Sequence, residues 1–469
     1  MTAPRSLKQV QENISSGEYT LPELIDFYLN QIEKQKNLNV FLEVWSKEAR
    51  EKATIIQQKL KDGTAGRLAG MVIGLKDNIV YKGHKVSASS KILEGFESLF
   101  SATVVERLLA EDALFIGRLN CDEFAMGSSN ENSCYGPALN PLDPAFVPGG
   151  SSGASAAAVA LETCHFSVGS DTGGSVRQPA AFCGVHGFKP TYGLHSRYGL
   201  IAYASSFDQI GYMVRYVEDL PQLFEITAGK DVNDATTVDW SYRWDGKEEP
   251  VAGKLGYLKV PEGLLDPIVE KGYQKVIDKL GADGIQLEAW EMSLEEYLVP
   301  TYYILTTAEA SSNLSRYDGI RYGLRHPGNS VESIVTNTRT KGFGKEVKRR
   351  LMMGTYVLSS GYYDAYYRKA QKVRGMIIRD MDQLFTKVEA LLLPVSPVLP
   401  WLVGAKVDDP VAVYYADIFT VLANLTGQPG ISVSLSGDQG AFPVGIQLIG
   451  PRFADDLLFK TGLFLTQLF

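Results

Sequence analysis

Short apolar runs alternate with a helical pattern in the first third of the chain. Met71–Leu75 and Ala113–Gly117 are uninterrupted apolar runs, and between them apolar residues recur at helical spacing over Val104–Leu109. Apolar runs of this length are typical of buried strands, and strands of this kind have both faces of their sheet covered. The strand–helix–strand order therefore predicts an α/β fold with a covered central sheet.

Helical patterns predict the organisation of the rest of the chain. Apolar residues recur at helical spacing over Leu7–Ile32, and Thr20 with Glu23 fits a capping box, so we expect helices starting near Ser6 and Thr20. No linker rich in serine and proline separates independent domains, so we expect one α/β unit with a largely helical part at about residues 230–385. Two stretches in that part have helical patterns: Asp266–Leu280, with Asp266 as N-cap, and Glu346–Asp380.

The composition excludes several classes of protein. Of 469 residues, 45% are hydrophobic and 21% are charged, as in globular proteins, and a formal charge of −8 disfavours non-specific binding of nucleic acid by this chain. No signal-like stretch opens the chain, and the longest apolar stretch, Ala390–Val403, is interrupted by prolines and too short to span a membrane. Four cysteines without metal-ligand spacing predict free thiols in a reducing compartment and no metal site. We therefore expect a soluble, cytoplasmic protein.

Residues 149–211 contain 11 of the 45 glycines of the chain. Two clusters of glycine and serine lie in this region, Pro148–Ser155, which leads into an alanine-rich helical pattern, and Gly169–Pro179. Glycine lets the backbone approach a bound group closely. In the second cluster, consecutive N–H groups over Thr172–Ser175 could converge on one point, as an oxyanion hole or an anion site requires.

These two loops do not fit other glycine-rich motifs. Gly153 is followed by Ala154 and Ser155 rather than by the lysine of a phosphate-binding loop. A dinucleotide fingerprint and a G-x-S-x-G nucleophile elbow are also missing, since Ser175 has glycine before it and valine after it. Ordinary surface turns remain an alternative, as does a non-catalytic anion-binding loop.

A nucleophilic serine needs a base, and the sequence offers two candidates. His186 is the first histidine after the two loops, but no acidic partner is recognisable beside it, so a packed or surface histidine is the alternative. Lys76 ends the apolar run Met71–Leu75, and burial there would lower its pKa and make it a proton acceptor. A surface lysine beside Asp77 is the alternative for this residue.

Three motifs together resemble the amidase signature family: Gly74–Asn78, Pro148–Gly153 and Gly169–Ser175. The resemblance implies a Ser–Ser–Lys triad with Ser175 as nucleophile, Ser151 as bridging serine in a cis peptide and Lys76 as base. It implies one amidase domain over residues 1–469 with its catalytic core at 65–215. The implied fold is a large mixed sheet with helices on both faces and a helical insertion. The oxyanion hole would consist of the backbone amides of Thr172, Gly173, Gly174 and Ser175.

The second half of the chain is similar to the glutaminase subunits of tRNA-dependent amidotransferases. The stretches that carry this resemblance are Ala308–Gly323, Gly342–Arg350, Gly354–Tyr356 and Ser359–Tyr367. The implied substrate is glutamine, whose α-carboxylate would bind Arg350 and whose ammonium would bind Asp417, with a contact from Tyr302 or Tyr303. The alternatives are a solvated basic helix face for Arg350 and a helix cap for Asp417.

The resemblance also implies partners and a reaction. A B subunit would use ATP and Mg²⁺ to activate the glutamyl or aspartyl group on mischarged tRNA, and a small C subunit would complete a heterotrimer. This chain would need no cofactor and would reach tRNA mainly through the B subunit. The alternative is a free-standing amidase for small, aryl or acyl amides. Departures from the family pattern are Ala154, His186 and Gln428–Gly430.

Overall fold

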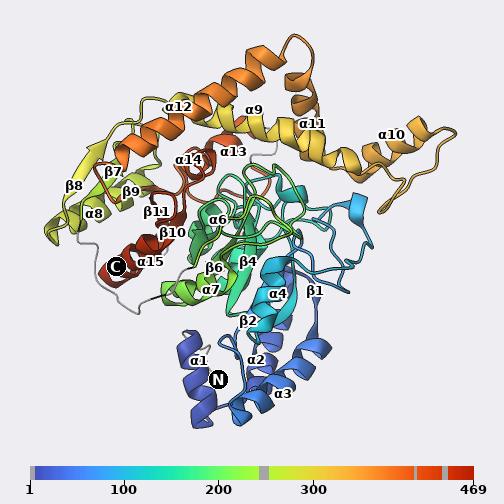
Figure 1. The fold of residues 1–469 in the computed structure, drawn as a ribbon, viewed down its shortest axis with the longest axis vertical. Coiled ribbons are helices and arrows are strands. Elements are labelled where there is room, and N and C mark those ends of the chain that lie inside the picture. Colours follow the sequence, from blue (N-terminus) through green and yellow to red (C-terminus); the bar gives the residue numbers. More distant parts are fainter. Residues whose placement is uncertain (1–5, 242–243, 245–252, 406–408, 436–441) are drawn as a thin grey trace.

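The computed structural model describes residues 6–241, 244, 253–405, 409–435 and 442–469. In this part of the chain one 11-stranded sheet has the order β1-β3-β2-β4-β6-β5-β10-β11-β9-β7-β8 (Figure 1). β2 pairs in parallel with β3 and β4, β7 pairs in parallel with β8 and β9, and the other neighbours are antiparallel. The strands are β1 (Phe41–Val44), β2 (Val72–Lys76), β3 (Leu114–Leu119), β4 (Phe166–Asp171), β5 (His186–Lys189), β6 (Gln209–Val214), β7 (Leu255–Leu258), β8 (Leu287–Trp290), β9 (Ala390–Pro394), β10 (Gly430–Leu435) and β11 (Val444–Ile449).

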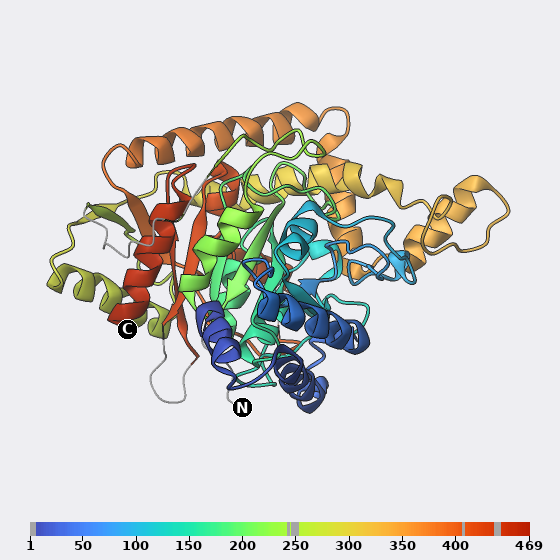
Figure 2. The same cartoon turned by 60° about the horizontal axis from the view of Figure 1, so that its bottom comes forward.

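Fifteen α-helices in the described residues surround this sheet. Figure 2 shows the long helices α9 and α12 running along one side of the molecule. In Figure 1, α10 projects from one end of the molecule. The helices are α1 (Leu7–Ser16), α2 (Leu21–Lys34), α3 (Ser46–Asp62), α4 (Thr103–Ala110), α5 (Gly153–Ala160), α6 (Arg177–Cys183), α7 (Leu220–Thr227), α8 (Pro267–Ala282), α9 (Glu295–Asn313), α10 (Val331–Gly342), α11 (Lys345–Leu358), α12 (Lys369–Leu384), α13 (Pro410–Tyr415), α14 (Val421–Thr426) and α15 (Asp455–Leu468).

Both faces of the sheet are buried under helices. In β3, Phe115 packs into the core beneath α4, α7, α8 and α15, whereas its neighbours Leu114 and Ile116 pack into the core beneath α2, α3, α5 and α6. In β9, Leu391 and Leu393 face a third core that α9, α12 and α14 cover. Successive side chains of a strand point to opposite faces, so strands covered on both sides are mainly apolar. The predicted α/β fold with a large mixed sheet covered on both faces is confirmed.

Local sequence patterns account for several boundaries. Ser6 caps α1, and Thr20 forms a capping box with Glu23 at the start of α2, as predicted. Asp266 accepts a hydrogen bond from the Ile268 backbone N–H at 2.9 Å and caps α8. Within the described residues, every helix is too short or too polar to cross a bilayer.

The structure adds detail to one expectation for the second half of the chain and corrects another. Besides its helices, the part at about 230–385 contains the four-residue strands β7 and β8 at one edge of the sheet. The helical stretch predicted over Glu346–Asp380 is interrupted after α11, where a π-helical segment, Tyr363–Arg368, precedes α12. Exposed aromatic side chains replace the regular apolar spacing there, so periodicity alone did not show the break.

Candidate active site

The order of β2, α5 and β4 brings the predicted triad residues to one edge of the sheet. β2 and β4 are adjacent parallel strands, so their carboxyl ends lie at the same edge. Lys76 is the last residue of β2, and the loop ending at Ser175 follows β4 directly. α5 crosses between the two strands, so its N-terminal end, where Ser151 lies, is at that edge as well.

Lys76 is fully buried and surrounded by hydroxyl groups. Its Nζ lies 2.8 Å from the Oγ atoms of Ser151 and Ser152 and 2.9 Å from Ser170 Oγ. Burial lowers the pKa of Lys76 to about 8, and acidic groups farther away, Asp122 among them, oppose this shift only in part. A measurable share of the amine is therefore neutral near pH 7 and can accept a proton.

The hydroxyls around Lys76 determine where its lone pair can point. Ser152 Oγ donates to the Ser170 carbonyl oxygen at 3.1 Å, so it accepts an N–H from Lys76. Ser170 Oγ accepts from Asn78 Nδ2 at 2.9 Å and can accept from Lys76 as well. When both N–H groups of a neutral amine are taken up in this way, its lone pair is left for the Ser151 hydroxyl.

Ser151 lies in a tightly packed turn. The peptide bond between Gly150 and Ser151 is cis, as the family resemblance implies. The Ser151 carbonyl accepts the Asp122 N–H at 3.1 Å, and Gly150 N–H donates to Gln178 Oε1 at 3.0 Å. A Cβ at Gly150 would lie 2.2 Å from Asp122 Oδ2, so glycine is required there.

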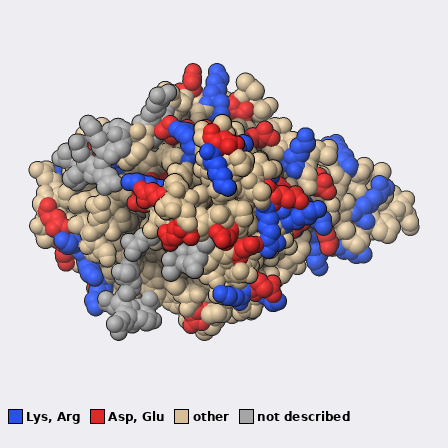
Figure 3. All heavy atoms as spheres, turned by 90° about the horizontal axis from the view of Figure 1, so that it is seen from below, with Lys and Arg blue, Asp and Glu red and all other residues tan. Residues whose placement is uncertain are grey.

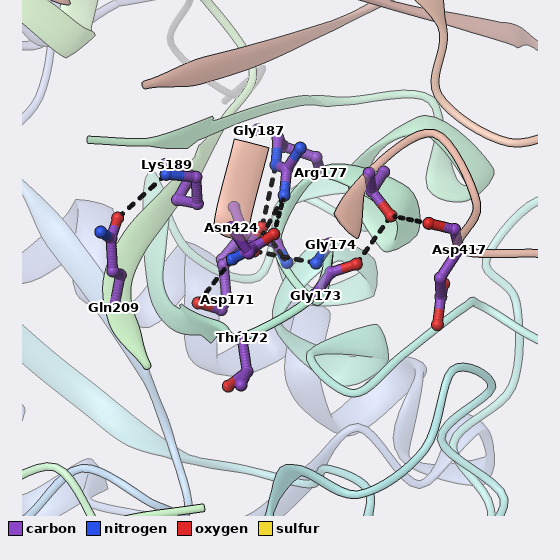
Figure 4. A network of polar contacts seen from close by, with 12 residues as sticks. Asp171, Thr172, Gly173, Gly174, Arg177, Gly187, Lys189, Gln209, Asp417 and Asn424 are labelled. Carbon is purple, nitrogen blue, oxygen red and sulfur yellow. Dashed lines mark hydrogen bonds and ion pairs between the residues drawn. The ribbon is translucent and has the colours of Figure 1, made fainter. Parts of the chain in front are cut away.

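Ser175 lies at the end of a loop that Asp171 organises. The Asp171 carboxylate accepts the N–H of Gly174 at 2.9 Å and that of Val176 at 3.2 Å. Arg177 and Asn424 also converge on this carboxylate, with Arg177 Nη2 at 3.0 Å from Oδ1 (Figure 4). Asp171 therefore closes the turn that presents Ser175.

This geometry changes the predicted oxyanion hole. The Gly174 N–H donates to Asp171, so in this conformation it cannot donate to a substrate oxygen. The remaining candidates among the four predicted amides are those of Thr172, Gly173 and Ser175. Gly174 has a φ of +124°, and a Cβ there would lie 2.2 Å from Thr420 Oγ1, so its role is to permit the turn.

The two glycine- and serine-rich loops are joined through the main chain. The Ser152 N–H donates to the Ser175 carbonyl at 3.2 Å. Among the hydrogen bonds of the described residues, none links the Ser151 and Ser175 hydroxyls, whereas Lys76 and Ser151 are in direct contact. Ser175 is 8% exposed and is the most accessible of the three predicted triad residues.

Arg350 is held in a cage of tyrosine rings. Its guanidinium lies 5.6, 5.1 and 5.4 Å from the ring centres of Tyr203, Tyr303 and Tyr414. Nε donates to Glu346 Oε1 at 2.8 Å and Nη1 donates to Tyr203 Oη at 3.0 Å. Arg350 is 2% exposed, so the alternative of a solvated basic helix face is wrong for this residue.

Asp417 is also buried, at the start of the turn before α14. Its carboxylate accepts a hydrogen bond from Ser128 Oγ, and burial raises the pKa of Asp417 to about 7, while Ser128 and Arg350 counteract this only in part. α14 has no side-chain cap, so the alternative that Asp417 caps this helix is wrong. Figure 4 shows Asp417 beside Gly173, and the Thr420 hydroxyl donates to the carbonyls of both residues.

The two tyrosines of α9 have different neighbours. A Cβ at Gly173 would lie 2.4 Å from Tyr302 Oη, so Tyr302 packs against the loop that ends at Ser175. Tyr303 stacks on Tyr414 with ring centres 4.0 Å apart, on the Arg350 side. A cavity of about 90 Å³ opens next to the guanidinium and is lined by Gly127, Ser129, Glu131, Asn132, Lys345, Glu346, Arg349, Arg350, Pro410, Val413 and Tyr414.

Several residues of this site were not predicted from the sequence. Glu346 precedes Arg350 by four residues, a spacing that on a helix would have indicated the ion pair. Ser128 and Tyr203 lie 289 and 147 residues from their partners Asp417 and Arg350, so no local pattern could reveal them.

The alternative base lies in the sheet. His186 is the first residue of β5, its Nδ1 accepts the Ser434 N–H at 3.3 Å, and burial lowers its pKa to about 4. A neutral histidine held by the neighbouring strand is the packed residue that the sequence left as an alternative. No cluster of potential metal ligands occurs in the part of the chain that the structure describes.

Comparison with known proteins agrees with the architecture and covers nearly the whole chain. The amidase family model matches residues 23–459. The chain is 46% identical over 460 residues to the glutamyl-tRNA(Gln) amidotransferase A subunit of Chlorobium phaeobacteroides, covering 97% of both proteins, and 43% identical to that of Salinibacter ruber, covering 96% of this chain and 97% of the relative. The crystal structure of the glutamyl-tRNA(Gln) amidotransferase A subunit from Thermotoga maritima superposes with a TM-score of 0.80 at 37% identity, covering 97% of this chain and 93% of that one. The chain belongs to the amidase family.

Proposed function

We propose that this chain is the glutaminase subunit of a tRNA-dependent amidotransferase. It would hydrolyse glutamine with a Ser–Ser–Lys triad and supply ammonia for the conversion of Glu-tRNA(Gln) to Gln-tRNA(Gln), or of Asp-tRNA(Asn) to Asn-tRNA(Asn). The observation that carries the proposal is the buried Lys76 amine, whose three hydrogen-bonding partners are serine hydroxyls. Similarity to glutamyl-tRNA(Gln) amidotransferases over 97% of the chain supports the choice of amidotransferase.

The triad would work by moving one proton along a relay. Neutral Lys76 accepts the Ser151 proton, Ser151 accepts the proton of Ser175, and the Ser175 oxygen bonds to the side-chain amide carbon of glutamine. The carbonyl π electrons move onto its oxygen, which the free amides of the loop stabilise. When the C–N bond breaks, the relay returns the proton to the leaving nitrogen and ammonia departs. Water then attacks the ester through the same relay, and glutamate leaves.

Arg350 and Asp417 would hold the two charged groups of glutamine. Nε and Nη1 of Arg350 donate to Glu346 and Tyr203, which leaves N–H groups of the outer guanidinium edge for the substrate α-carboxylate. Asp417 would receive the α-ammonium, whose charge would lower the carboxyl pKa from its value of about 7. Tyr302 packs against the loop ending at Ser175 and Tyr303 against Arg350, so Tyr302 is the better placed to contact the reacting end of the substrate.

This arrangement disfavours a free-standing amidase for aryl or acyl amides. An apolar acyl group would leave the outer N–H groups of the buried Arg350 and part of the buried Asp417 carboxyl without a ligand, and unsatisfied buried polar groups are costly. A bacterial aryl acylamidase shares the fold, with a TM-score of 0.84 at 21% identity. That likeness concerns the fold and leaves the choice of substrate to the site residues.

The surface supports the proposed B and C partner subunits. Methionine and tyrosine side chains are exposed together along α11 and the π-helical segment after it, which is unusual for a monomer. In Figure 3, acidic and basic side chains are interspersed over the face shown, which fits contact with tRNA through a B subunit that also carries ATP and Mg²⁺. We place this reaction in the cytoplasm, where the four free thiols would stay reduced. The exposed residues are Met352, Met353, Tyr356, Leu358, Tyr362, Tyr363 and Tyr366.

Co-purification together with a glutaminase assay tests this function. We expect the full-length chain, isolated from its native lysate, to bring down a B and a C subunit and to release ammonia from glutamine faster than from benzamide. A chain that purifies alone and prefers benzamide or oleamide would overturn the amidotransferase assignment.

A further inference from the structure

Asp208 connects two parts of the site that are distant in sequence. Its Oδ1 accepts a hydrogen bond from Thr172 Oγ1 at 2.7 Å. Its Oδ2 accepts the N–H groups of Tyr203 at 2.9 Å and Ala204 at 3.0 Å. The residue is 3% exposed, so each carboxylate oxygen is directed at a different structural element inside the protein.

The Thr172 side of Asp208 belongs to the reactive loop. Thr172 follows the last residue of β4 and opens the turn that ends at Ser175. Its backbone amide is among the remaining candidates for the oxyanion hole. A hydroxyl fixed by a buried carboxylate restrains the orientation of this first residue of the loop.

The Tyr203 side belongs to the cage around Arg350. Tyr203 Oη accepts from Arg350 Nη1 at 3.0 Å and donates to Thr306 Oγ1 at 3.0 Å, and its ring lies against the guanidinium. The position of the Tyr203 backbone, which Asp208 holds, therefore determines where the cage can place the guanidinium.

The sheet makes this connection rigid. Asp208 immediately precedes β6, and β6 pairs with β4 so that Gln209 lies opposite Asp171. The carboxylate is thus anchored on the strand next to the one that carries the reactive loop. Burial raises the pKa of Asp208, while the hydrogen bonds from Thr172, Ala204 and Tyr203 act against this shift by favouring the charged form.

We propose that Asp208 is a positioning residue that couples the loop of Ser175 to the Arg350 cage. Through it, the position of the bound α-carboxylate and the orientation of the loop amides depend on each other. This inference rests on the proposed function, because it assumes that Arg350 binds the carboxylate of glutamine. It predicts that a substitution at Thr172 and a substitution at Tyr203 do not affect kcat/KM independently of each other.

A double-mutant cycle tests the coupling in the full-length chain assembled with its partner subunits. Thr172→Val is expected to lower kcat for glutamine, and Tyr203→Phe is expected to raise KM. The loss in kcat/KM of the double variant should differ from the product of the two single losses by at least about threefold, because the effects of coupled residues are not additive. In the Asp208→Asn background, the loss in kcat/KM caused by both changes together should equal the product of the two single losses. Thr172→Ser keeps the hydroxyl and should restore the coupling.

Controls separate coupling from loss of structure. Asp219→Asn changes another buried carboxylate, which binds Leu7 and His165, and should leave kcat and KM unchanged. If Asp208→Asn does not fold, the cycle of Thr172→Val and Tyr203→Phe in the native background is the test of coupling. Losses that multiply in the native background would overturn the coupling. Failure of the wild-type complex to hydrolyse glutamine would instead refute the proposed function.

Discussion

Lys76 Nζ lies 2.8 Å from Ser151 Oγ although the two residues are 75 positions apart in the chain. The contact follows from topology, because Lys76 ends a strand and Ser151 precedes the helix that crosses to the adjacent parallel strand. Among the described residues no charged group contacts this buried amine, whose hydrogen-bonding neighbours are serine hydroxyls. Burial thus makes the charged form of Lys76 less favourable than it is in water, so a share of the amine is neutral near pH 7, as a base requires.

Removal of the proposed base should strongly slow amide hydrolysis. We expect Lys76→Ala to lower kcat for glutamine by about 10²-fold to 10⁴-fold, the range typical of general-base catalysis, with little change in the dissociation constant for glutamine. Ammonia release and calorimetric binding measure the two quantities. Lys82→Ala, at an exposed position, serves as the control. Near-normal turnover by Lys76→Ala would exclude this lysine as the base.

Activity should rise with pH over the neutral range. Lys76 must be neutral, and because burial lowers its pKa to about 8, kcat/KM should increase up to that pH and then level off. In the proposed site Asp417 must be ionised to bind the α-ammonium of glutamine, and because burial raises its pKa to about 7, a second increase in kcat/KM should occur near pH 7.

Asp417→Asn assigns the two limbs of this profile. The variant should lose the limb near pH 7, keep the one near pH 8 and show a higher KM at every pH. A kcat/KM that falls between pH 6 and pH 8 would contradict both assignments.

The proposed carboxylate clamp should affect binding rather than chemistry. Arg350→Lys removes the planar fork, and we expect KM for glutamine to rise about 10-fold to 100-fold, since hydrogen bonds to charged groups contribute about 1.5–3 kcal/mol. Hydrolysis of a simple amide without an α-carboxylate should change little. Arg368→Lys alters an exposed ion pair and should have no effect. Equal loss on both amides would assign Arg350 a structural role instead.

Gly174 should tolerate no side chain. Gly174→Ala combines a φ of +124° with a Cβ 2.2 Å from Thr420 Oγ1, so we expect loss of activity and a lower Tm. The matched control is Gly281→Ala in α8, where the added Cβ meets no atom of the described residues within 4 Å beyond its own stretch of helix. This helical change should raise the free energy of unfolding by about 0.5–1 kcal/mol. Thermal unfolding and activity assays measure both effects. A Gly174→Ala variant that stays active and stable would contradict this prediction.

Local patterns predicted what depends on local structure. Residues that are close in the sequence determine several of these features. They include the helix caps at Ser6, Thr20 and Asp266 and the buried strand that ends at Lys76. β7 and β8 escaped prediction because four-residue strands at the edge of a sheet have too few positions to show a period.

The site required both local and distant information. The family motifs brought Lys76, Ser151 and Ser175 to attention, whereas the Tyr203 contact with Arg350 spans 147 residues and depends on packing. The hydrogen bond from Gly174 N–H to Asp171 could not be predicted either. The motif shows which backbone amides belong to the loop, but not which of them already donate a hydrogen bond within the protein.

Covalent labelling tests the central claim, that Ser175 is the nucleophile. The full-length chain, assembled with its partner subunits, is treated with a serine-directed fluorophosphonate and examined by intact mass and peptide mapping. We predict one adduct, on Ser175, which forms more slowly in the presence of glutamine, is nearly lost in Lys76→Ala and is absent in Ser175→Ala. An adduct on another residue, or one that persists in Ser175→Ala, would contradict the account.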